Sequence, residues 1–109
     1  MAGSTKKLAA VLGTGQTKYV AKRHDVSMNG LVREAIDRAL ADAGSTMDDI
    51  DAVVVGKAPD FFEGVMMPEL FMADATGATN KPLIRVHTAG SVGGSTAVVA
   101  ASLVQSGKY

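Results

Sequence analysis

Residues 88–107 read TAGSVGGSTAVVAASLVQSG, and this stretch decides the predicted fold. It contains no charged residue, and it directly follows the short apolar run LIRVH at residues 83–87. This order predicts a strand that leads through small residues into a helix. A helix without charge on any face belongs in the interior of a protein, so we expect residues 88–107 to form a buried helix.

The composition limits the possible classes of function. The chain has 109 residues, of which 47% are hydrophobic, and this suits one α/β domain rather than two. Eleven Lys or Arg balance eleven Asp or Glu, and the cations are scattered, so we expect neither nucleic acid nor an anionic membrane as a partner. The lack of cysteine excludes disulfides and thiolate chemistry in these residues, and no metal site is expected.

The apolar stretches of the chain do not predict targeting to a membrane. The run at residues 8–12 is too short for the hydrophobic part of a signal peptide. Residues 89–107 are nearly long enough to cross a bilayer, but their glycines and hydroxyl residues favour a helix inside a protein. We therefore expect a cytoplasmic protein without a membrane span.

Three short apolar runs predict the strands of a sheet: residues 8–12, 52–56 and 83–87. Continuous apolar runs are typical of strands covered on both faces in a parallel sheet. Helical patterns alternate with these runs, at residues 28–43, 45–50 and 68–75. The alternation predicts an α/β fold with an open, largely parallel sheet, helices on both faces and one buried helix.

The helix at residues 28–43 has the clearest limits, because its apolar residues recur at steps of three and four. Asp25 or Ser27 can cap its start, and Gly44 lies where a left-handed residue ends a helix. Pro68 favours the start of the shorter helix, and Gly77 ends it.

Several motifs have both a structural and a functional interpretation. Residues 13–15, Gly-Thr-Gly, follow a strand as phosphate-binding loops do, but the spacing fits neither phosphate motif, so a structural turn is favoured. The segment at residues 57–64 pairs Asp60 and Glu63 with two phenylalanines. A mobile loop that covers the core or a partner subunit is favoured there over an acid–base pair. Three methionines are interpreted as adaptable packing: Met66, Met67 and Met72.

Two histidines and one serine are candidates for chemistry. His24 lies among charged residues and is interpreted as a solvated loop residue. His87 ends a strand just before a glycine turn, which is a favourable position for chemistry. The alternative, a hydrogen-bonded interior histidine, is the commoner outcome. Ser91 begins the uncharged helix, where unpaired amides and the helix dipole stabilise a developing anion. The alternative is that Ser91 only caps the helix, while Gly93 and Gly94 let another backbone approach.

Residues 11–19 (VLGTGQTKY), 32–44 (VREAIDRALADAG) and 50–56 (IDAVVVG) resemble the opening of the thiolase family, in particular its sterol-carrier and lipid-transfer branch. In that branch a reactive cysteine opens a buried helix as CSTGSTA, and residues 91–97 here read SVGGSTA. The resemblance places Ser91 at the position of the nucleophile, with substrate-binding positions at His87, Gly90 and Val92. It implies that residues 1–109 are an incomplete amino-terminal thiolase-like domain.

The resemblance also implies a function. The expected protein handles acyl-CoA thioesters of lipids or steroid side chains, by acyl transfer or by retro-aldol cleavage, with the coenzyme A thioester as substrate and no other cofactor. The expected partners are acyl-CoA, together with a second copy of the chain or a small acyl-CoA-binding protein. The alternatives are a catalytically silent subunit that stabilises an active partner, and a nucleotide-binding module built around residues 13–15. An open apolar edge at residues 8–12 further predicts self-association of the isolated chain.

Overall fold

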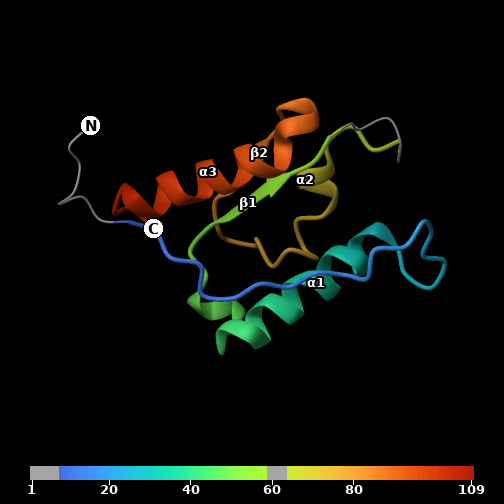
Figure 1. Cartoon of the computed structure of the whole chain (residues 1–109), viewed down its shortest axis with the longest axis horizontal. Coiled ribbons are helices and arrows are strands. Elements are labelled where there is room, and N and C mark those ends of the chain that lie inside the picture. The colour runs from blue at the N-terminus through green and yellow to red at the C-terminus, as the bar shows by residue number, and fades with distance from the viewer. Residues whose placement is uncertain (1–7, 59–63) are drawn as a thin grey trace.

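The computed structural model describes residues 8–58 and 64–109. It contains two strands and three α-helices, together with two short 3-10 helices at Met47–Asp49 and Ala89–Ser91. In chain order the main elements are α1 (Met28–Ala43), β1 (Val53–Gly56), α2 (Pro68–Phe71), β2 (Leu83–Val86) and α3 (Val92–Gln105). Figure 1 shows α1 and α3 on opposite sides of the strand pair. The predicted α/β class is therefore confirmed.

The two strands form a parallel pair in which Val53 lies opposite Leu83 and Gly56 lies opposite Val86. The predicted third strand at residues 8–12 is wrong, because these residues join no ladder in the described chain. They lead instead into a segment attached to α1, where the Thr14 amide donates a hydrogen bond to an Asp42 carboxylate oxygen at 2.9 Å.

The limits of α1 are those predicted. The Ser27 hydroxyl accepts a hydrogen bond from the Gly30 amide at 3.0 Å, so Ser27 and not Asp25 is the cap. Gly44 adopts a φ of 66°, a left-handed conformation that glycine adopts without a steric penalty. The predicted turn after it is the 3-10 helix Met47–Asp49, in which the Thr46 amide donates to an Asp49 carboxylate oxygen.

Glycines let extended segments approach both long helices. A Cβ atom on Gly13 or Gly15 would collide with backbone atoms of α1, and a Cβ atom on Gly56 would collide with the Thr96 side chain of α3. The predicted structural turn at residues 13–15 is not observed: these residues carry no turn, and their glycines permit the close contact with the α1 backbone instead.

The prediction that residues 88–107 form a buried helix is wrong in one respect. The helix forms as α3 and contacts both strands, but none of its residues is buried. Val98 is 65% exposed, because within residues 8–58 and 64–109 the strand pair covers only one side of α3. None of the helices in the described chain has the length and hydropathy that a membrane crossing requires.

The small core lies around the turns that follow α2. Met72, Thr76, Ala78 and Val86 are buried, and the Thr76 hydroxyl donates to the Ala73 carbonyl at 2.9 Å. The packing role predicted for Met72 is confirmed. For the other two methionines it is wrong, since Met66 is 84% exposed and Met67 is 61% exposed.

The apolar residues before α1 are also exposed in the described chain. Leu8, Val11 and Leu12 each keep about four fifths of their surface in water. Contiguous exposed apolar surface favours association. Self-association of the isolated chain stays a prediction.

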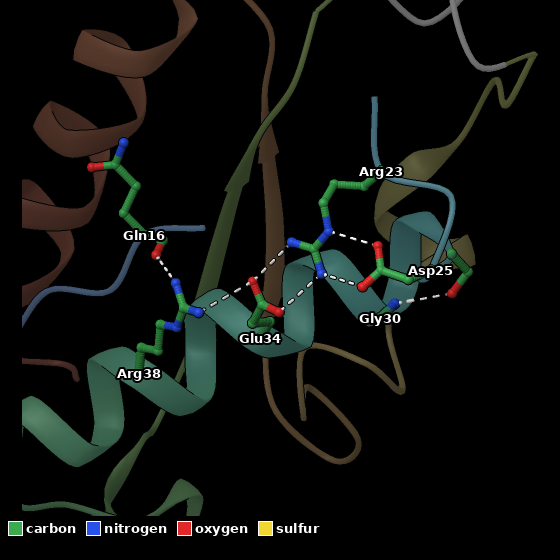
Figure 2. A network of polar contacts seen from close by, with 7 residues as sticks. Gln16, Arg23, Asp25, Gly30, Glu34 and Arg38 are labelled. Atoms are coloured by element: carbon green, nitrogen blue, oxygen red, sulfur yellow. Dashed lines mark hydrogen bonds and ion pairs between the residues drawn. The ribbon is translucent and has the colours of Figure 1, made fainter. Parts of the chain in front are cut away.

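A network of charged side chains attaches residues 16–25 to α1 (Figure 2). The Arg23 guanidinium bonds both carboxylate oxygens of Asp25, at 2.8 and 2.9 Å, and both of Glu34, at 3.2 Å. Arg38, one turn further along α1, pairs with Glu34 at 3.6 Å and donates a hydrogen bond to the Gln16 carbonyl. Hydrogen bonds from Arg23 hold the pKa of Asp25 and of Glu34 below their ordinary values.

The close contact at Gly15 gives a first prediction. Replacing Gly15 with Ala inserts a Cβ into the α1 backbone, and we expect this overpacking to lower the free energy of unfolding by about 1–3 kcal/mol. The control is Gly94→Ala in α3, where the space beside the glycine is open and alanine favours the helix by about 0.5–1 kcal/mol. Denaturant unfolding of the two variants measures both changes. Equal effects in the two variants would contradict the described contact.

The network gives a second prediction, on pH. Because the folded-state pKa of Asp25 and Glu34 is lowered, their contribution to stability is present at neutral pH. It is lost as the pH falls through the lowered values, below about pH 4. We expect Arg23→Met to lower the unfolding midpoint at pH 7 and to make little difference once both carboxyls are protonated. Thermal melts of both proteins between pH 7 and pH 2.5 measure this; a difference that stays constant with pH argues against the network.

Candidate functional site

The sequence-predicted site residues lie together where β2 ends. His87 and Thr88 follow the strand, the 3-10 helix Ala89–Ser91 turns the chain, and α3 begins at Val92. In α/β proteins ligands bind outside the carboxyl ends of parallel strands. The carboxyl end of β1 lies beside this turn, because Gly56 pairs with Val86.

The hydroxyl of Ser91 belongs to a group of three. It lies 2.9 Å from the Thr88 carbonyl oxygen and 3.1 Å from the Thr88 hydroxyl, and the Thr88 hydroxyl in turn donates to Ser95 at 2.8 Å. The Ser91 side chain makes no capping bond to an amide of α3. The alternative that Ser91 acts as a side-chain cap is therefore wrong.

His87 is exposed, so the alternative of an interior histidine is wrong. Its Nδ1 accepts a hydrogen bond from the Ala89 amide at 3.5 Å, so the neutral ring carries its hydrogen on Nε2. Ala89 itself has a φ of 49°, in the left-handed region that costs a side-chain-bearing residue energy. Strained backbone of this kind is concentrated at functional sites.

No base contacts the Ser91 hydroxyl among the residues that the structure describes, where its partners are the two oxygens of Thr88. A serine hydroxyl is a weak nucleophile unless a neighbouring base accepts its proton. Ser91 is therefore better placed to donate a hydrogen bond to a developing negative charge than to attack a carbon atom.

The turn is open to solvent. Nothing lies within 4 Å of the Cβ positions of Gly90, Gly93 and Gly94, so the predicted close approach of another backbone to Gly93 and Gly94 is not observed in the described chain. Gly90 is exposed and Val92 is half-buried. Within the described chain the first turn of α3 is therefore uncovered on its glycine side.

Two other predictions fall elsewhere. The Asp60 and Glu63 pair lies outside the described residues, because residues 59–63 are not described. His24 is exposed, as predicted. Across residues 8–58 and 64–109 the acidic and histidine side chains form no group of three suited to a metal ion.

Sequence reasoning missed a second polar region, residues 16–23. Tyr19 is 96% exposed, and together with the start of α1 the segment borders an open cavity of about 420 Å³. Two signals in the sequence could have indicated it. One is the aromatic residue between Lys18 and Lys22, and the other is the spacing of four between Glu34 and Arg38, typical of a helix ion pair.

Comparisons with known proteins give the same family twice. The family described as "TsaD: tRNA N6-adenosine threonylcarbamoyltransferase" has a sequence model that matches residues 16–104. A tRNA N6-adenosine threonylcarbamoyltransferase of Ruegeria sp. (strain TM1040) is 34% identical over 85 residues, which cover 77% of this chain and 22% of that protein. The chain therefore spans about a fifth of the length of this curated relative.

These matches correct the expectations drawn from the resemblance. The assignment to the thiolase family is wrong, and so are the acyl-CoA function, the acyl-CoA partner and the lipid and steroid roles. The quoted segments are short and rich in Gly, Ala and Val, a composition that many α/β proteins share, and the cysteine that carries thiolase chemistry is absent at position 91. The thiolase-like arrangement is likewise unsupported by the two-stranded sheet.

The exclusion of nucleic acid is also wrong, because the matched family is named for a reaction on tRNA. The net charge of the chain was a poor guide to whether it binds nucleic acid, because it counts paired and unpaired cations alike. It also covers a chain that spans only 22% of the length of its relative. The family match extends over residues 16–104, far more than half of the sequence, and on this ground the chain belongs to the tRNA N6-adenosine threonylcarbamoyltransferase family.

Proposed function

We propose that the protein containing this chain transfers a threonylcarbamoyl group to N6 of an adenosine in tRNA. The observation that carries the proposal is the family match over residues 16–104. The curated relative from Ruegeria sp. bears the name of the same activity. Because the chain spans 22% of that relative, the activity belongs to the whole protein, and this chain contributes part of it.

The reaction makes a defined demand on the protein. The N6 nitrogen forms a bond to the carbonyl carbon of an activated threonylcarbamoyl donor. The bond from that carbon to the leaving group then breaks, and the leaving group keeps its electron pair while N6 loses a proton. Between these steps the carbonyl oxygen carries negative charge, and fixed hydrogen-bond donors aimed at this oxygen lower the barrier.

The first turn of α3 is suited to meet this demand. The start of a helix carries a partial positive charge and presents amides that lack helical partners. We assign the Ser91 hydroxyl as the side-chain donor, with Gly90 and Val92 flanking it; the Ser91 and Val92 amides themselves donate to the Thr88 and Ala89 carbonyls. Gly90 and Ser91 are exposed, and their exposure leaves room for a substrate. His87 is assigned to bind the substrate as a second donor: its Nδ1 accepts from the Ala89 amide, so the neutral ring carries its hydrogen on Nε2, and the proton lost by N6 passes to water.

The substrate also suggests a compartment. A protein that modifies tRNA works where tRNA is present, and we propose the cytoplasm. The helices of the described chain, none of which could span a bilayer, are compatible with this.

The test is a transfer assay with the product of the complete reading frame, unmodified tRNA and an activated threonylcarbamoyl donor. Mass spectrometry of the digested tRNA measures the modified adenosine. We expect Ser91→Ala to lower kcat about 10²-fold with little change in KM, because one donor to the oxyanion is lost.

The matched control is Ser102→Ala. Ser102 lies on the same helix, is exposed, and donates its hydroxyl to the Val98 carbonyl far from the first turn. Failure of the wild-type protein to modify tRNA refutes the proposed function. Normal turnover by the Ser91 variant refutes only the role of the α3 turn.

A further inference from the structure

A second surface, residues 16–23, combines exposed cations and an exposed aromatic ring, which α3 lacks, with an adjacent cavity. The segment is exposed on one side and faces the start of α1 on the other. In Figure 1 it lies toward the end of the molecule opposite the carboxyl terminus.

The segment is held at both ends. At its beginning Arg38 donates to the Gln16 carbonyl, and at its end Arg23 bonds to Asp25 and Glu34. Figure 2 shows that one carboxylate, Glu34, links the two arginines. A surface segment fixed at both ends loses less conformational freedom when it binds a ligand than a free loop does.

The network also separates the charges. The carboxylates nearest the segment, Asp25 and Glu34, are taken up by Arg23 and Arg38. Lys18 and Lys22 are exposed, and within the described residues neither forms an ion pair. The segment therefore presents two uncompensated positive charges, although the whole chain is neutral.

Tyr19 lies between these lysines and is 96% exposed. The cavity of about 420 Å³ next to it extends from the segment to Val26, Met28 and Leu31. Small-molecule cavities begin at about 300 Å³, so this one is large enough for a single nucleoside. Proteins read single-stranded RNA by stacking unpaired bases on aromatic rings and by contacting phosphates with Lys or Arg.

We propose that residues 16–23 bind a single-stranded stretch of the tRNA, with Tyr19 stacking on a base and with Lys18 and Lys22 contacting phosphates. The inference rests on the proposed function for the identity of the RNA. It adds a binding surface on α1, separate from the α3 turn assigned to the transfer reaction.

The experiment measures binding of labelled tRNA, of a single-stranded oligoribonucleotide and of an RNA duplex to the product of the complete reading frame, by fluorescence anisotropy over a range of salt. We expect the double variant Lys18→Gln, Lys22→Gln to reduce the slope of log K against log salt by about 1.4, because each phosphate contact on a single strand contributes about 0.7. We expect Tyr19→Ala to weaken binding to the single strand about tenfold and binding to the duplex much less, while Tyr19→Phe keeps the ring and the affinity.

The matched controls are Lys108→Gln and Tyr109→Ala, which alter another lysine and tyrosine pair, in which the ammonium lies 5.7 Å from the ring centre. Equal losses in the controls, an unchanged salt slope, or equal loss for duplex and single strand each overturn the inference. Preferential binding of an acidic peptide at this segment also overturns it.

If the variants reduce RNA binding but the wild-type protein does not modify tRNA, the binding surface stands and the proposed function fails. If modification proceeds and the variants bind RNA normally, only this inference fails.

Discussion

The arrangement of this chain depends on backbone contacts that only glycine permits. Gly13 and Gly15 lie so close to α1 that a Cβ atom would overlap its backbone, and Gly56 at the end of β1 does the same with Thr96 of α3. These contacts keep each long helix against an extended segment in a chain whose core is small. The position of the α3 turn relative to the strands, and of residues 16–23 relative to α1, follows from them.

Signals close together in the sequence predicted the local structure well. The limits of α1 and the turn after it depend on residues within four positions of one another, such as Ser27 with Gly30 and Thr46 with Asp49. Residues 8–12 were predicted wrongly because apolar character permits burial in a sheet but does not supply a neighbouring strand, and Leu8, Val11 and Leu12 stay exposed in the described chain. The prediction that α3 is buried was wrong for the same reason. An absence of charge permits burial, but it does not supply the elements that would enclose the helix.

In the candidate sites, too, features set by neighbouring residues could be predicted from the sequence, and contacts between distant residues could not. The sequence placed Ser91 at the start of a helix, and it is there, but its bond to Thr88 depends on the turn at Ala89 and could not be predicted from composition. The link between Arg23 and Glu34 spans a loop and a helix, and no periodicity indicates it. Only the pair of Glu34 with Arg38, which are four residues apart on one helix, was open to prediction.

Charge shows why the total composition of a chain says little about its partners. Ion pairs fix cations and anions in place, and a screened surface field acts over only about 10 Å at moderate salt. What an incoming phosphate meets is therefore the local balance of charge. Around Glu34 two arginines occupy one carboxylate, and Arg23 also occupies Asp25. The ion pairs that hold residues 16–23 on α1 thus leave the two lysines of this segment without a neutralising partner. The same network fixes the conformation of the segment and leaves its surface positively charged.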